Sequence, residues 1–135
     1  MRTKLVAGVV LGVAALAVTT LAAVSPVQTA VVRFMRPTII AGAAVLGTVV
    51  FEHDAERMAR GEPCTTVYYY DAGARRRGRM LVEFMCIPVA RDGSRQFEAT
   101  ISRSDLTGPD RLTEYRFAGE LEGHGVPVRP GHQAH

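Results

Sequence analysis

The stretch CTTVYYYDAGARRRGRMLVEFMC, residues 64–86, holds both cysteines of the 135-residue chain, one at each end. Its two halves, TTVYYY and RMLVEF, are rich in β-branched and aromatic residues, which are typical of strands. If the segment folds back at Arg75, Cys64 lies directly opposite Cys86. Opposed residues of an antiparallel pair have Cβ atoms ~4.5–5.5 Å apart, close to the separation that a disulfide needs. The sequence therefore predicts a hairpin closed by a cross-strand disulfide.

This disulfide also bears on the compartment of the protein. By the chain-entropy model, closing a loop of this size contributes ~3 kcal/mol to stability. Disulfides persist in oxidising compartments, so the pairing predicts a domain outside the cytoplasm. The alternative is that Cys64 and Cys86 are reduced and are opposed by coincidence.

Two further strands are expected downstream of the hairpin. QFEATIS, residues 96–102, and TEYRFAG, residues 113–119, alternate apolar and polar side chains with the period of a strand. Together with the hairpin they predict a four-stranded antiparallel β-meander over residues 62–119. Residues 120–135 are rich in Gly and Pro and show no period, so we expect an extended tail there.

Upstream of this domain lie two apolar segments, and the first runs from Leu5 to Val24. It has 20 residues without a charge, enough to cross a bilayer core of ~30 Å as a helix. The alternative is a secretory signal peptide, although the apolar part of such peptides usually has ~7–15 residues. Gly8 and Gly12 are spaced to allow close packing of another helix. We assign residues 1–36 to this segment and a linker.

The second apolar segment is PTIIAGAAVLGTVVF, residues 37–51, and good helix formers follow it. We interpret residues 37–61 as a membrane-anchor helix whose last turns extend into water, with a helix-packing face at Ala43 and Gly47. The predicted fold class is thus α+β, with one or two membrane segments before a small disulfide-linked β-meander. Met35 offers an alternative start, which would make residues 1–34 an upstream extension. Three fates of the first segment therefore stay open: it is cleaved, it spans the membrane, or it precedes the true start.

The charge distribution argues against nucleic-acid binding. The formal net charge is +3, but residues before 52 carry +4 and the remainder carries −1. The basic excess therefore flanks the apolar segments, where it orients membrane insertion, and is absent from the domain. One basic cluster does occupy the hairpin tip and suits lipid headgroups or an acidic partner; the alternative is a solvated loop. Its members are Arg75, Arg76, Arg77 and Arg79.

No pattern for catalysis or cofactor binding is present. The four histidines, at positions 53, 124, 132 and 135, have no metal-site spacing, and the two cysteines fit no zinc module. Phosphate-loop, dinucleotide and nucleophile-elbow motifs are missing. We therefore predict a non-enzyme without metal, cofactor or small-molecule substrate.

These observations suggest an accessory subunit of a larger integral membrane complex, of a respiratory or photosynthetic kind. The chain would be anchored in the bilayer of the bacterial inner membrane with its β-domain in the periplasm, and it would support assembly or stability. The alternative is a free periplasmic module, released from a cleaved signal, that binds a small ligand or a metal or acts as a small enzyme.

Overall fold

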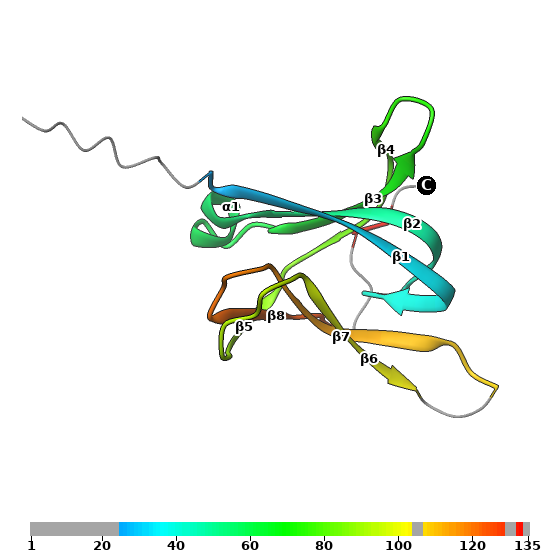
Figure 1. The fold of residues 1–135 in the computed structure, drawn as a ribbon. Helices are drawn as coiled ribbons and strands as arrows, with labels where there is room; N and C mark the ends of the chain where they lie inside the picture. The colour runs from blue at the N-terminus through cyan, green and yellow to red at the C-terminus, as the bar shows by residue number, and fades with distance from the viewer. Residues whose placement is uncertain (1–24, 104–106, 129–131, 134–135) are drawn as a thin grey trace, which may run out of the picture.

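The computed structural model describes residues 25–103, 107–128 and 132–133, and these residues form mainly β-structure (Figure 1). The first apolar segment, with Gly8 and Gly12, lies outside the described residues. The elements are β1 (Val27–Ile40), β2 (Ala43–Asp54), α1 (Ala55–Ala59), β3 (Thr65–Asp71), β4 (Arg76–Phe84), β5 (Ile87–Ala90), β6 (Glu98–Arg103), β7 (Asp110–Arg116), β8 (Glu122–Gly125) and β9 (His132–Gln133).

The strands belong to one mixed sheet in the order β5-β8-β7-β1-β2-β3-β4-β9, with β6 paired to β7. All pairs are antiparallel except β1 with β7, which meet in parallel through only two residue pairs. The sheet folds over at this short junction. Strands β1 to β4 form one layer and β5 to β8 form the other, with the two layers facing each other (Figure 1). The core lies between them.

The predicted membrane-anchor helix over residues 37–61 is wrong, and with it the α+β fold class. Residues 37–51 form the end of β1, a tight turn and most of β2. Within the described part of the chain, none of the helices has the length and apolar character needed to cross a bilayer. Only the last part of the expected helix is helical, as the five-residue α1 that Asp54 caps by accepting hydrogen bonds from the amides of Glu56 and Arg57.

Local sequence explains why this segment forms a hairpin. Seven of the fifteen residues from 37 to 51 are β-branched, and such side chains pack well on a pleated strand. Ala41 and Gly42 have φ values of 46° and 87° and connect β1 to β2 as two-residue hairpin turns require. Ala43 follows the turn as the first residue of β2. Gly47 has φ of 90° beside a register shift in β1, so neither residue forms the helix-packing face that was predicted.

The β-hairpin of residues 64–86 is present, but its register differs from the prediction. Folding about Arg75 would place Thr66 opposite Phe84, whereas Thr66 pairs with Glu83. The turn is asymmetric because the register shifts twice between Val67 and Tyr70. The predicted meander is wrong at its middle pairing, since β4 pairs with β9 rather than with β6. The expected antiparallel pairing of β6 with β7 is present.

The core of the two layers is aromatic in its centre. Phe51 of β2 is fully buried, and its ring centroid lies 5.2 Å from that of Tyr115 on β7 and 5.6 Å from that of Phe97. The Tyr115 hydroxyl hydrogen-bonds the Thr65 hydroxyl of β3 across the layers, and burial raises the pKa of Tyr115. These contacts join β2, β3 and β7 across the two layers.

Candidate metal centre

Four side chains with metal-binding atoms converge where the chain crosses from one layer to the other. His53 comes from the end of β2, and Cys64 directly precedes β3. Cys86 lies in the short link between β4 and β5, and His124 lies in β8. His53 and His124 are 4% and 1% exposed, Cys64 is buried, and Cys86 is half-buried. The fold therefore assembles these residues from four separate segments of the chain.

The distances within this cluster are short. One donor atom each from His53, Cys86 and His124 lies within 4.8 Å of the other two. The Cys86 Sγ atom is 3.6 Å from His53 Nε2, and the two imidazole ring centroids are 4.1 Å apart. Two bonds around tetrahedral zinc, each of ~2.0–2.3 Å, place neighbouring donor atoms ~3.3–3.8 Å apart. The donor atoms of His53, Cys86 and His124 thus need to approach one another by about 1.5 Å at most to surround an ion.

Glu120 orients the His124 ring. Its Oε2 atom lies 3.1 Å from His124 Nε2, and since a carboxylate only accepts, Nε2 donates. The other nitrogen, Nδ1, then carries a free lone pair in the neutral ring. Nδ1 is buried and has no hydrogen-bond partner among the described residues. A carboxylate that fixes one nitrogen while the other is left for coordination is the usual outer-shell arrangement around metal-bound histidine.

The two cysteines form a hydrogen-bonded pair. The Cys86 amide donates to Cys64 Sγ over 3.2 Å, and the pair interacts through its side chains. The hydrogen bond from the Cys86 thiol, aided by His53, lowers the pKa of Cys64, while the same hydrogen bond and burial raise the pKa of Cys86. Both residues carry free thiols here, so the disulfide stays a prediction. They meet although the ladder register is not the predicted one, because Cys86 lies beyond the end of β4.

An open cleft of about 500 Å³ lies beside the cluster. Its walls include both histidines, and α1 and the loop before β8 complete it. Met58 and Glu120 contribute a thioether and a carboxylate to this wall. The cleft gives an ion a path to the otherwise buried histidines.

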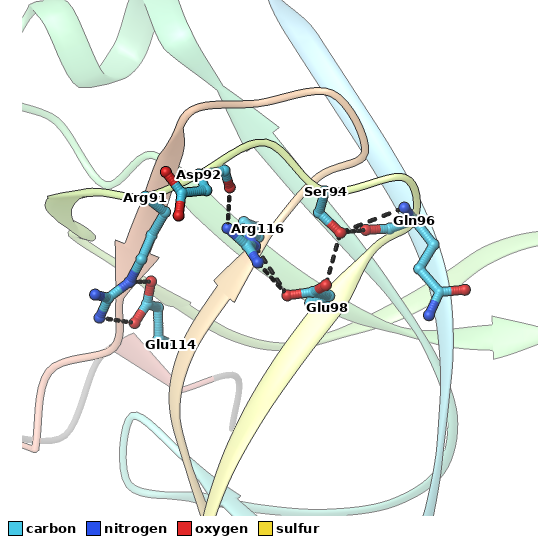
Figure 2. A network of polar contacts seen from close by, with 7 residues as sticks. All are labelled: Arg91, Asp92, Ser94, Gln96, Glu98, Glu114 and Arg116. Atoms are coloured by element: carbon cyan, nitrogen blue, oxygen red, sulfur yellow. Dashed lines mark hydrogen bonds and ion pairs between the residues drawn. The ribbon is translucent and has the colours of Figure 1, made fainter.

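A network of polar contacts supports the strand that carries His124 (Figure 2). Arg91, just after β5, holds Glu114 of β7 through two hydrogen bonds of 2.8 Å. Glu114 in turn covers Gly123 of β8 so closely that a Cβ atom there would meet its Oε1 at 2.0 Å. A side chain at position 123 would therefore require the Glu114 carboxylate to move away from β8.

The second half of the network fixes the loop between β5 and β6 (Figure 2). Arg116 of β7 pairs with Glu98 of β6 and donates to the Asp92 carbonyl, and the Ser94 hydroxyl donates to Glu98 over 2.7 Å. These contacts are partly exposed, so each contributes little to stability. They join β6 and the loop before it to β7.

The arginine-rich tip lies at the opposite end of the β3–β4 hairpin from the two cysteines, and some of its side chains have partners within the domain. Arg77 pairs with Glu52 and lies over the Tyr68 ring, and Arg79 lies over the Tyr69 ring. Arg75 adopts φ of 53° in the turn, and Arg76 begins β4. All four are exposed. Docking of the tip to lipid headgroups or an acidic partner stays a prediction.

No family model, curated protein or solved structure matches this chain. Function is therefore argued from the site itself.

The sequence analysis missed this cluster because it assigned His53 to a helix and His124 to a tail. A signal for His53 was nevertheless present, because Val49, Phe51 and His53 occupy every second position, as on one face of a strand. Once residues 43–54 are known to be a strand, these three side chains share its buried face. His124 had no comparable signal, since its neighbours Gly123 and Gly125 suggested a loop.

Proposed function

We propose that the β-domain is a metal-binding module that holds one Zn²⁺ ion between its two layers. The observation that carries the proposal is the convergence of His53, Cys86 and His124 within 4.8 Å in a largely buried position. Cys64, in contact with Cys86, is the fourth donor. Two imidazoles and two thiolates are a common donor set of closed, non-catalytic zinc sites.

Charge supports the same ion. A thiolate buried without a counter-charge is unfavourable, and two such thiolates balance the charge of one divalent cation. Soft sulfur donors disfavour hard ions such as Mg²⁺ and Ca²⁺, which prefer oxygen. Glu120 would hold the His124 ring in the orientation and tautomer that coordination through Nδ1 needs.

Cobalt substitution tests this proposal. The reduced full-length chain is titrated with Co²⁺, which occupies zinc sites and reports thiolate coordination by charge-transfer absorption. We expect one equivalent to bind with such absorption and to be displaced by Zn²⁺. Cys86→Ser and His124→Ala should each weaken binding by more than ~100-fold, beyond the 10–100-fold effect of outer-shell changes.

His132→Ala is the matched control, because His132 belongs to the C-terminal group of histidines and lies in β9, which pairs with β4 at the opposite end of the sheet order from β8. It should bind as tightly as the unaltered chain. Loss of binding in His132→Ala with retention in His124→Ala would assign the metal to the C-terminal histidines and refute the site. Absence of thiolate-to-cobalt absorption would refute it as well.

The second candidate is the accessory subunit of a membrane complex on the periplasmic side of the inner membrane. Three large apolar side chains favour it, since Val31, Met35 and Leu46 are exposed on the β1–β2 hairpin.

Native gels and mass spectrometry of a mild detergent extract of membranes test this candidate. We expect the chain to migrate with a larger complex, and Leu46→Arg, at an exposed position, to release it. Migration of the unaltered chain as a free monomer, with all large complexes intact in its absence, would contradict it.

A further inference from the structure

We infer that Cys64 and Cys86 are a redox pair that controls the metal site, so that joining them in a disulfide releases the ion. This inference rests on the proposed zinc site. It assigns the same two sulfurs to two exclusive states, metal ligands when reduced and a disulfide when oxidised.

The geometry around Cys64 supports the pairing. Its Sγ atom accepts a hydrogen bond of 3.2 Å from the Cys86 amide, which brings the backbone of one cysteine against the sulfur of the other. The Cys64 amide is held by the Phe84 carbonyl at 3.2 Å, and the Cys64 carbonyl accepts from the Asp54 amide at 2.8 Å. Cys64 is therefore fixed, while Cys86 lies in a link outside the regular strands. We expect movement of this link to bring the Cys86 sulfur to that of Cys64.

Exposure assigns the order of the reaction. Cys86 is half-buried and Cys64 is buried, so an external disulfide such as oxidised glutathione meets Cys86 first. The Cys86 thiolate attacks one glutathione sulfur, the glutathione S–S bond breaks, and a mixed disulfide forms while the other glutathione leaves as thiolate. Cys64 then attacks the Cys86 sulfur as thiolate and displaces the second glutathione as thiolate. Two protein thiols are oxidised and one glutathione disulfide is reduced.

Oxidation removes both sulfur donors together. The ion would keep only His53 and His124, because a disulfide sulfur carries no charge and is a poor ligand. Loss of two of four donors, including all of the negative charge, predicts release of the ion through the adjoining cleft. Reduction of the disulfide restores both thiolates and the site.

The experiment compares zinc affinity in two redox states of the full-length chain. Affinity is measured by competition with a chromophoric chelator, first on reduced protein under anaerobic conditions and then after treatment with oxidised glutathione. We expect the oxidised chain to bind Zn²⁺ at least ~100-fold more weakly, because changes to outer-shell partners alone weaken metal binding by ~10–100-fold. The zinc affinity should recover after reduction. Its intact mass should fall by two hydrogens without a glutathione adduct.

Cys64→Ser separates the resolving step from the first attack. This variant should keep a glutathione adduct at Cys86, since no second thiol displaces it. Full zinc affinity in the oxidised chain, or an unresolved adduct on the unaltered chain, would overturn the redox inference while leaving the zinc site intact. Failure of the reduced chain to bind Zn²⁺ would instead overturn the proposed function, and the inference with it.

Discussion

Phe51→Ala is expected to lower the free energy of unfolding by ~3–5 kcal/mol, whereas Leu46→Ala should change it by less than ~0.5 kcal/mol. Both residues belong to the apolar segment of residues 37–51. Phe51 is 0% exposed and contacts the rings of Phe34, Phe97 and Tyr115, so its removal opens a cavity in the core. Leu46 is 53% exposed on the other face of β2.

Denaturant unfolding of the purified full-length chain, followed by far-ultraviolet circular dichroism, measures the difference. Each variant truncates one large apolar side chain, and both positions lie on the same strand. Equal effects of the two would contradict the structure, in which Phe51 is buried and Leu46 is exposed on opposite faces of β2. A spectrum dominated by helix would contradict the fold as well.

The sequence was most informative where polar and apolar residues alternate. The expected strands over TTVYYY and RMLVEF correspond to β3 and β4, and those over residues 96–102 and 113–119 overlap β6 and β7. Each of these segments carries its own period or β-branched and aromatic composition, so local physics is enough. The two local pairings, β3 with β4 and β6 with β7, are present, whereas the predicted pairing of β4 with β6 is wrong. That part of the topology depends on contacts between distant parts of the chain, such as β1 with β7.

Residues 37–51 show why a continuous apolar run is ambiguous. A buried helix tolerates such a run, and so does a strand that is buried on one face and partly covered on the other. Its length suggested a helix, but Ala41 and Gly42 divide it into two shorter strands. Nothing in the residue type of Ala41 predicts a positive φ. The β-branched residues on both sides of this turn were the better guide.

The site was predictable only in part. The cysteines meet as expected from their symmetrical placement, although in a different register, and both contribute to the cluster. Its histidines come from β2 and β8, which are not neighbours in the sheet and approach only because the layers fold together. Sequence spacing cannot reveal ligands that are joined by such long-range packing. A zinc module with ligands in short motifs would have been recognised.

Zinc should raise the melting temperature of the reduced chain by ~10 °C or more. A ligand that binds only the folded state at 100 times its dissociation constant stabilises that state by ~2.7 kcal/mol. For a domain of about 100 residues, each kcal/mol shifts the melting temperature by ~4–8 °C. The shift should be large here because the donors come from four segments, so the unfolded chain offers no comparable site.

Thermal unfolding with and without Zn²⁺ measures this shift in matched variants. His132→Ala should keep it, while His124→Ala and Cys86→Ser should lose most of it, whatever their stability without metal. The quantity compared is the zinc-dependent difference within each variant, so a general loss of stability does not imitate the result. Mg²⁺ should give no shift, since the donors are nitrogen and sulfur. An equal zinc-dependent shift in His124→Ala and the unaltered chain would show that stabilisation arises away from the cluster, and the metal centre would have to be abandoned.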